Sequence, residues 1–236
     1  MKEKVYRHKA KQRQQSMNMN VNKFKAKAIF FDLDGTIVDS RGAYYEAARA
    51  AFRAVGQEPP EMKTALEIPR RLEQKRPLSD IIRVDTRKFL DVYLEAYYSV
   101  TETKTNLLPN VSTVLKTLSA RAKLALITMR AVPKESIMKE LDHFGVANCF
   151  NYVVTALDTL KPKPSPEALA KCVEALDVQI CDCVIVGDSI NDVKAGKAAG
   201  AGTVAVLSGL FSREEVAVEH PDLIIKDATS LPTFIE

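Results

Sequence analysis

The sequence contains few of the residues that stabilise secreted or zinc-binding proteins. Its 236 residues include four cysteines, Cys149, Cys172, Cys181 and Cys183, which are too few and too irregularly spaced for a disulfide framework. Cys181 and Cys183 have no second pair at the spacing of a structural zinc site. Reduced thiols are usual in the cytosol, so we expect a cytoplasmic protein without disulfide bonds.

Long apolar segments are also lacking. No stretch approaches the roughly 18 apolar residues of a membrane-spanning helix, and no apolar segment follows the basic N-terminus as it would in a secretory signal. We therefore expect no membrane partner. A mitochondrial targeting segment stays open, although residues 12–20, rich in Gln and Asn, show no clear amphipathic stripe. Residues 1–22 are polar and low in complexity, which predicts a disordered basic tail.

The positive charge of the chain comes from its N-terminus. The net charge is +4, but residues 1–27 contain nine of the 34 basic residues and one of the 30 acidic residues. The remaining body carries 25 basic and 29 acidic residues, a net charge of −4. A mildly acidic body argues against a nucleic-acid-binding surface, so we expect no nucleic-acid partner.

Short apolar runs alternate with helical patterns along most of the chain. The runs that predict buried strands are 26–31, 124–127, 152–154, 184–186, 203–207 and 223–225. Helical patterns occupy 111–120, 133–144, 191–199 and 213–218, and another helix opens with Ser165 as N-cap and Pro166 at the first helical position. This alternation predicts an α/β fold, a Rossmann-like parallel sheet with helices on both faces.

Residues 40–107 interrupt the alternation. They show helical periodicity throughout, are broken by prolines and contain no convincing strand. Two apolar stripes run through this stretch: Tyr44, Ala48, Ala51, Phe52 and Val55 in the first, and Phe89, Val92, Tyr93 and Ala96 in the second. We expect an all-helical insert at 40–107 within a core formed by 23–39 and 108–236.

The first acidic motif stands where the first predicted strand ends. It reads Asp32-Leu33-Asp34-Gly35-Thr36. Residues two apart in extended backbone point the same way, so both carboxylates face the crevice in which open α/β sheets bind ligands. Gly35 allows a sharp turn. Two adjacent carboxylates repel each other unless they share a cation or a proton, so the pair predicts a cation site.

A second acidic motif follows the strand at 184–186. It reads Gly-Asp-Ser-x-x-Asp over residues 187–192 and brings Asp188 and Asp192 to another strand end, with Ser189 between them. Asp192 can open the next helix, and Gly196 permits close helix packing. A site of hard oxygen ligands without His or Cys favours Mg²⁺.

Two weaker signals supply phosphate-binding groups. Thr128 ends the strand at 124–127, where its hydroxyl can donate to a phosphate oxygen. Lys161 and Lys163 each precede a proline, which biases both toward extended backbone. The stiffened segment presents a lysine just before a helix, and either ammonium can reach the crevice.

These motifs, in this order over residues 26–236, resemble the haloacid-dehalogenase-like superfamily, in the phosphoglycolate-phosphatase-like branch with a helical cap. The resemblance rests on three motifs: DLDGT at 32–36, GDSxxDxxAG at 187–196 and KPxPE at 163–167. It implies a Mg²⁺-dependent phosphatase that hydrolyses a small phosphorylated metabolite, phosphoglycolate-like or a sugar phosphate, through an aspartyl-phosphate. It also makes residues 40–107 the cap.

The resemblance implies a role for each motif residue. Asp32 would be the nucleophile and Asp34 the general acid and base. Thr128, Lys163 and Gly35 would hold the phosphate. Asp32, Asp34 through its carbonyl, and Asp188 would bind Mg²⁺, with Asp192 and Ser189 in support. The KPxPE register selects Lys163 over Lys161.

One departure and two alternatives remain. Relatives often carry a small or amide residue after the threonine, whereas Met129 and Arg130 follow here, which leaves the meaning of Arg130 for the substrate open. One alternative is a phosphomutase of the same fold, β-phosphoglucomutase-like. The other is a non-catalytic binding protein, against which the complete set of Asp32, Asp34, Lys163 and Asp188 argues.

The tail at 1–22 should be dispensable for catalysis, because it lies outside the strand pattern. Deletion should leave kcat/KM within about twofold, well below the ~1.4 kcal/mol of a tenfold loss. Steady-state kinetics of the deleted and full chains measure this. A larger loss at unchanged thermal stability would show that the tail contacts the site.

Overall fold

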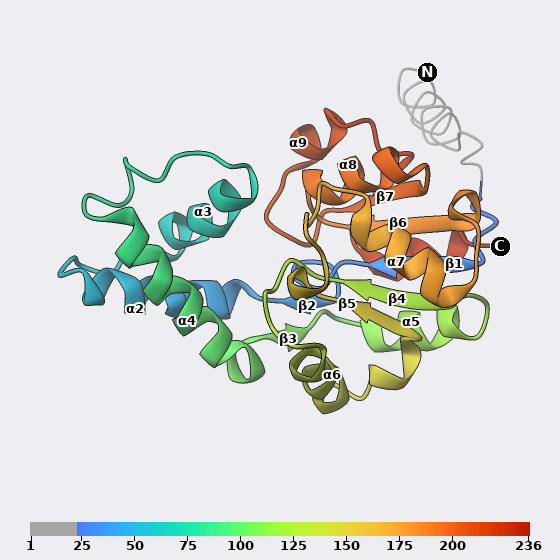
Figure 1. Cartoon of the computed structure of the whole chain (residues 1–236), viewed down its shortest axis with the longest axis horizontal. Helices are drawn as coiled ribbons and strands as arrows, with labels where there is room; N and C mark the ends of the chain where they lie inside the picture. Colours follow the sequence, from blue (N-terminus) through green and yellow to red (C-terminus); the bar gives the residue numbers. More distant parts are fainter. Residues whose placement is uncertain (1–22) are drawn as a thin grey trace, which may run out of the picture.

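The computed structural model describes residues 23–236, so the predicted tail lies outside the described residues. Figure 1 shows two lobes, one built on a sheet with helices around it and one built from three helices. Two chain segments join the lobes, one leading into the helical lobe after the first strand and one returning from it.

The larger lobe contains a six-stranded sheet. Its strands are β1 (Ala28–Phe31), β4 (Lys123–Ile127), β5 (Tyr152–Val154), β6 (Cys183–Gly187), β7 (Gly202–Val206) and β8 (Leu223–Ile225). Their spatial order is β5-β4-β1-β6-β7-β8, and every neighbouring pair is parallel. The prediction of a Rossmann-like parallel sheet is therefore confirmed.

Helices cover both faces of this sheet. The helices of the larger lobe are α5 (Val111–Ser119), α6 (Lys134–His143), α7 (Glu167–Leu176), α8 (Ile190–Ala199) and α9 (Arg213–Ala217), with short 3-10 turns at Ala147–Cys149, Ala156–Asp158, Ile180–Asp182 and Ala228–Thr233. Phe31 packs with Leu115 of α5 and Leu141 of α6. The preceding Phe30 packs on the other face with Leu169 of α7. Successive strand residues face opposite sides, which explains the continuous apolar runs.

One predicted helix start is displaced. Ser165 is not the N-cap of α7, and Pro166 is not its first residue. The helix begins at Glu167, because the Pro166 carbonyl accepts the first helical hydrogen bond, from Ala170 N at 3.0 Å. Ser165 Oγ still accepts from the N–H of Glu167 at 3.3 Å. The hydroxyl therefore pairs an N–H at the start of α7, although Ser165 lies one residue before the N-cap.

The smaller lobe consists of α2 (Arg41–Ala54), α3 (Met62–Glu73) and α4 (Thr86–Lys104). The two predicted apolar stripes meet in a separate hydrophobic cluster that includes Phe52 and Phe89. The expectation that 40–107 contains no strand is wrong. β2 (Val38–Asp39) pairs antiparallel with β3 (Asn106–Leu107) where the chain enters and leaves the lobe. Two-residue strands are too short to show the alternation that predicts a strand.

The strand order creates a crevice beside β1. From β1 the chain continues to β4 and β5 on one side, whereas from β6 it continues to β7 and β8 on the other. The connections after β1 and β6 therefore diverge, and open α/β sheets bind ligands at such a switch point. Over residues 23–236, the structure has no helix with the length and apolar character to cross a bilayer.

Close packing of α8 on the sheet depends on Gly196. A Cβ at this position would lie 2.5 Å from Ile185 Cγ2 and 2.6 Å from Thr203 Cγ2. Gly196→Val should therefore destabilise the fold by about 1–3 kcal/mol through overpacking, measured by urea unfolding. Ala198→Val is the matched control, because Ala198 is exposed on the same helix and should lose about 0.5 kcal/mol or less. Equal losses would contradict the packing requirement at position 196, because valine has a better helix propensity than glycine and only overpacking predicts a loss in Gly196→Val.

Candidate active site

Three aspartates meet at the carboxyl edge of the sheet. Asp32 follows β1, Asp188 follows β6, and Asp192 lies in the first turn of α8. Each offers a carboxylate oxygen within 4.8 Å of the others, although all three residues are buried, with exposed fractions of 6%, 6% and 1%. Isolated buried carboxylates are costly, so this cluster requires positive charge.

Lys163 supplies one positive charge to the cluster. Its Nζ lies 2.5 Å from Asp32 Oδ1 and 2.6 Å from Asp192 Oδ1, and it also donates to the carbonyl of Ile127 at 3.3 Å. Burial opposes its charge, but Asp192 and Asp32 raise the pKa of Lys163 above the usual lysine range. Lys161 is exposed. The structure therefore brings Lys163, and not Lys161, to the acidic motifs.

Local hydrogen bonds fix the second acidic motif. Ser189 Oγ accepts from the N–H groups of Asn191 and Asp192, and Asp192 Oδ2 accepts from Ser189 N at 3.2 Å. This capping box satisfies helix donors that would otherwise be unpaired. Ser189 thereby orients Asp192 toward Lys163.

Gly35 brings the first motif close to the second. It has a φ of +82°, a conformation that glycine adopts without steric cost. A Cβ here would lie 2.7 Å from Asp188 Oδ2. Thr128, at the end of β4, is buried, and its Oγ1 accepts from Arg130 N at 3.2 Å. The hydroxyl hydrogen of Thr128 is then available to a phosphate oxygen.

The charge balance of the cluster fits a divalent cation. Burial is the main cause that raises the pKa of Asp32 and of Asp188 well above the ordinary aspartate range, and neighbouring carboxylates add to it. One ammonium therefore compensates the three carboxylates incompletely. Hard carboxylate oxygens without sulfur or imidazole donors suit a hard divalent cation.

The Asp34 side chain pairs with Arg130 and not with Lys163. Arg130 binds it through two parallel contacts, Nε to Oδ2 at 2.8 Å and Nη2 to Oδ1 at 2.6 Å. Tyr97 donates to the same carboxylate at 3.0 Å, as does Ser40. Burial works against ionisation of Asp34, but Arg130 outweighs it and, with these donors, lowers the pKa of Asp34. Asp34 is thus held as a carboxylate.

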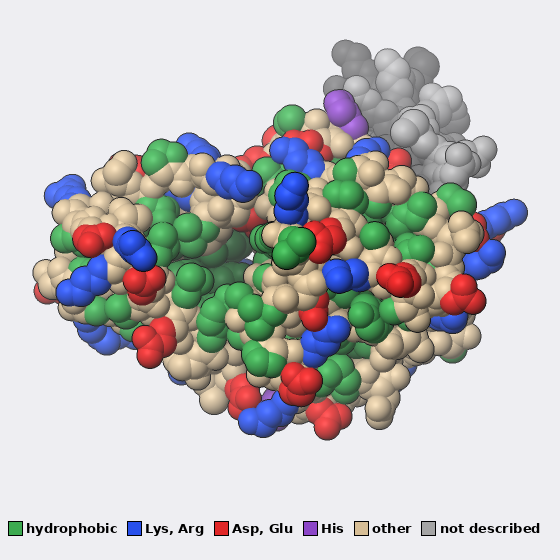
Figure 2. All heavy atoms as spheres, in the orientation of Figure 1, with side chains coloured by type: hydrophobic (Ala, Val, Ile, Leu, Met, Phe, Trp, Pro, Cys, Tyr) green, Lys and Arg blue, Asp and Glu red, His purple; other side chains and the backbone are tan. Residues whose placement is uncertain are grey.

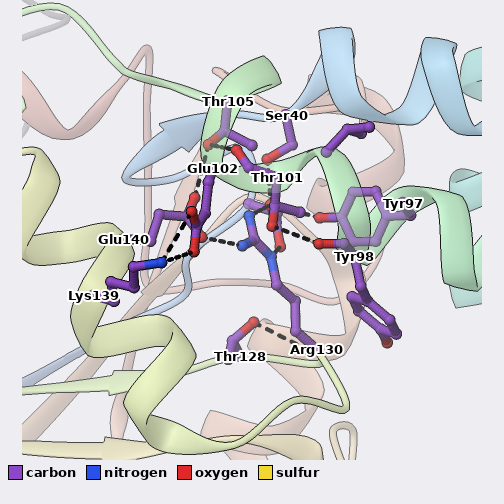
Figure 3. Close-up of polar contacts among 12 residues, drawn as sticks. Ser40, Tyr97, Tyr98, Thr101, Glu102, Thr105, Thr128, Arg130, Lys139 and Glu140 are labelled. Carbon is purple, nitrogen blue, oxygen red and sulfur yellow. Dashed lines mark hydrogen bonds and ion pairs between the residues drawn. The ribbon is translucent and has the colours of Figure 1, made fainter.

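The Arg130 guanidinium also ties the larger lobe to the chain that leaves the helical lobe. Arg130 bonds the buried carboxylate of Glu140 on α6, and Thr105, just after α4, donates to Glu140 at 2.7 Å. Figure 3 shows Arg130, Glu140 and Thr105 in one continuous chain of contacts. The role of Arg130 could not be predicted from the sequence. Its position two residues after Thr128 was the available signal, because residues two apart in extended backbone face the same way.

A cavity of about 250 Å³ opens beside these groups. Asp32, Asp34 and Asp188 line it from the larger lobe. The helical lobe contributes Tyr44, Pro69, Leu72, Glu73, Tyr93, Leu94, Tyr97 and Tyr98. Two of these, Tyr44 and Tyr93, belong to the predicted apolar stripes, and none of the eight was predicted to line a cavity. The acidic cluster is therefore accessible from a chamber between the two lobes.

The family model for haloacid dehalogenase-like hydrolases matches residues 29–206, most of the chain. The chain belongs to this hydrolase family. It is 30% identical to a phosphoglycolate phosphatase of Psychrobacter arcticus, with 88% of this chain and 94% of that protein covered. It is 32% identical to a phosphoglycolate phosphatase of Vibrio vulnificus, over 87% and 94% of the two chains. The predicted superfamily and its phosphoglycolate-phosphatase-like branch are confirmed.

Solved structures of haloacid dehalogenase-like proteins share the fold. A predicted phosphoglycolate phosphatase from Haemophilus somnus superimposes with a TM-score of 0.72 at 22% identity, covering 89% of this chain and 97% of that chain. A hydrolase from Pseudomonas syringae gives a TM-score of 0.69 at 24% identity, over 88% and 96%. These structures show the fold, and the predicted phosphatase class rests on the sequence relatives.

The two lysines provide a matched comparison within one segment. Lys163→Ala removes the ammonium that contacts Asp32 and Asp192, so kcat/KM should fall by about 10²–10³-fold, as when one preorganised donor is lost. Lys161→Ala should cost less than about tenfold, because an exposed lysine contributes little local interaction energy. Steady-state kinetics on both purified variants, with melting curves for folding, measure the difference. The reverse ranking would contradict the placement of Lys163.

Proposed function

We propose that this chain hydrolyses a small phosphomonoester through an aspartyl-phosphate on Asp32. The observation that carries the proposal is the position of the Lys163 ammonium, buried 2.5 Å from Asp32 and 2.6 Å from Asp192 beside Asp188. This arrangement holds a nucleophilic carboxylate next to fixed positive charge at the mouth of a cavity. The phosphatase names of the sequence relatives support the same reaction class.

In the first step an Asp32 oxygen attacks phosphorus and the bond to the ester oxygen breaks, which divides one difficult hydrolysis into two easier steps. Lys163 offsets the repulsion between carboxylate and phosphate, and Thr128 and the chain at Gly35 border the phosphoryl oxygens. Asp34 first takes up a proton from solvent when the substrate binds, passes that proton to the leaving oxygen, and then accepts a proton from the attacking water. The bonds of Arg130, Ser40 and Tyr97 to Asp34 orient its carboxylate and suit the second step.

Mg²⁺ is the metal that we propose for the acidic cluster. Asp32, Asp188 and the Asp34 carbonyl would hold it, with Asp192 and Ser189 supporting Lys163 and the loop. A bound Mg²⁺ neutralises charge on the phosphoryl oxygens. The oxygen-only donor set supports this choice over softer metals.

We assign residues 40–107 as a mobile cap that selects the leaving group, with 23–39 and 108–236 as the catalytic core. The side chains that the helical lobe contributes to the cavity support this division. A small phosphorylated metabolite is the proposed partner, and the side chains of the helical lobe would decide which alcohol it carries. The free thiols of Cys149, Cys172, Cys181 and Cys183 support a cytoplasmic location.

Phosphate release should require both Mg²⁺ and Asp32. Asp32→Asn removes the nucleophile at nearly constant volume, so turnover should fall below a few per cent of wild type while the melting temperature is kept. Acid quenching with a ³²P-labelled phosphomonoester should trap label on the wild-type chain and none on Asp32→Asn. Asp91→Asn, exposed on α4 and outside the cavity, is the control and should retain full activity.

The same experiment distinguishes the alternatives. A phosphomutase would label Asp32 but return phosphate to a second hydroxyl of its substrate, with little free phosphate. A binding protein would show neither label nor release. Full activity in excess chelator would overturn the role of Mg²⁺, and retained turnover in Asp32→Asn would place the nucleophile elsewhere.

A further inference from the structure

The cavity wall away from the acidic cluster is rich in apolar and aromatic side chains. Tyr44, Leu72, Tyr93, Leu94, Tyr97 and Met129 contribute to it. Figure 2 shows a hollow between the two lobes with much of its visible wall in the colour of hydrophobic side chains. The volume of about 250 Å³ is large beside the roughly 10–15 Å³ that holds one water. A phosphoryl group with a two-carbon acid would leave much of this space unfilled.

The cations of the wall are already paired. Among the described residues that line the cavity, Arg41 and Arg130 are the basic ones. Arg130 is buried and bound by Asp34 and Glu140. Arg41 pairs with Asp39, at 2.8 Å from Nε to Oδ1. A substrate carboxylate entering this wall would therefore have to displace an existing ion pair.

Acidic groups in the cavity also disfavour a substrate carboxylate. Besides the catalytic aspartates, Asp39 and Glu73 line the cavity. Glu73 stands at the end of α3, where Asn191 Nδ2 donates to its backbone carbonyl at 3.1 Å. Burying an unpaired anion beside other acids is costly. An uncharged leaving group avoids that cost.

One buried polar atom in the wall lacks a partner. Tyr93 is 2% exposed and lines the cavity, and its hydroxyl makes no hydrogen bond within the described part of the chain. An unpaired buried hydroxyl is destabilising, because the group has lost its hydrogen bonds to water. Burial and the nearby charge of Asp34 raise the pKa of Tyr93, so the group stays a neutral donor. A hydroxyl or carbonyl on the leaving group would satisfy it.

Resting on the proposed function, we infer that the preferred substrate is the phosphomonoester of an uncharged alcohol with a flat apolar or aromatic face, rather than phosphoglycolate. The tyrosine and leucine side chains would cover that face, and Tyr93 would donate to a neutral oxygen. The phosphoryl group would meet Asp32 and Lys163 as already described. Selection against the carboxylate follows from the absence of an unpaired cation among the described lining residues.

Three primary-alcohol phosphates test the inference in two steps. Phosphoglycolate carries the carboxylate, 2-hydroxyethyl phosphate replaces it with a neutral hydroxymethyl group, and 2-phenylethyl phosphate replaces the hydroxyl of that compound with an aromatic ring, so the second step tests the apolar wall without the contact to Tyr93. With wild-type full-length protein and Mg²⁺, kcat/KM should rise in that order, by at least tenfold from first to last. Equal values, or phosphoglycolate as the best substrate, would overturn the inference. Release from none of the three, together with no ³²P label on Asp32, would instead overturn the proposed function.

A charge placed in the wall tests the same idea by gain of function. Leu94 lines the cavity and is 41% exposed, so Leu94→Arg can be accommodated and adds an unpaired cation. The ratio of kcat/KM for phosphoglycolate to that for 2-phenylethyl phosphate should rise at least tenfold. Leu157→Arg, at a 61% exposed position outside the cavity, should leave the ratio unchanged.

Arg41 offers the competing route for a carboxylate. Its exposed ion pair with Asp39 is weak and could exchange for a substrate anion. In Arg41→Gln, kcat/KM for phosphoglycolate should stay within about twofold of the low value expected for the wild-type protein. A wild-type preference for phosphoglycolate that disappears in Arg41→Gln would show that Arg41 recognises the carboxylate, and the inference would fail.

Discussion

The contact of the Lys163 ammonium with Asp32 and Asp192 is the constraint on which the site depends. Three carboxylates share a volume that excludes most water, and in such surroundings charge is tolerated only when it is paired. Three separate chain segments must meet to satisfy it: the end of β1, the continuous stretch from the end of β6 to the first turn of α8, and the loop before α7. The parallel sheet provides this meeting, because the carboxyl ends of its strands lie along one edge. The parallel sheet therefore brings the three aspartates and the lysine that pairs with them to the same edge.

A second set of buried ion pairs, centred on Arg130, links the larger lobe to the helical lobe. The guanidinium of Arg130 connects Asp34 with Glu140, and Thr105 continues the chain to the segment that leaves the helical lobe. Removing either partner of a buried pair is costly, because it leaves the other charge unpaired. Ser40, at the entrance to the same lobe, also donates to Asp34. The carboxylate proposed as acid and base is thus bonded directly at one connection between the lobes and linked through Arg130 and Glu140 to the other.

Much of this could be predicted from the sequence because the relevant signals are local. The strands at 152–154 and 223–225 match residue for residue, and the acidic motifs stand directly after β1 and β6. What could not be predicted depends on contacts between distant segments. The β2–β3 pair joins residues about seventy positions apart, and the partner of Arg130 lies 96 residues away. Periodicity identified Tyr93 as a buried position, but the same pattern serves a core residue and a cavity wall.

This distinction also limits what the relatives can say about substrate. In the proposed reaction the two halves of a phosphomonoester would meet different parts of the chain. Phosphorus would face the acidic motifs at the sheet edge, and the alcohol would face side chains that α2, α3 and α4 contribute to the cavity. Selectivity between alcohols is a difference in binding free energy in that second region. A carboxylate-bearing alcohol needs a free cation there, and in the described wall the guanidinium groups of Arg41 and Arg130 are both committed to acids of the protein. Similarity in the acidic motifs therefore supports the same reaction in this chain and its relatives. The preferred leaving group must instead be inferred from the cavity side chains of this chain.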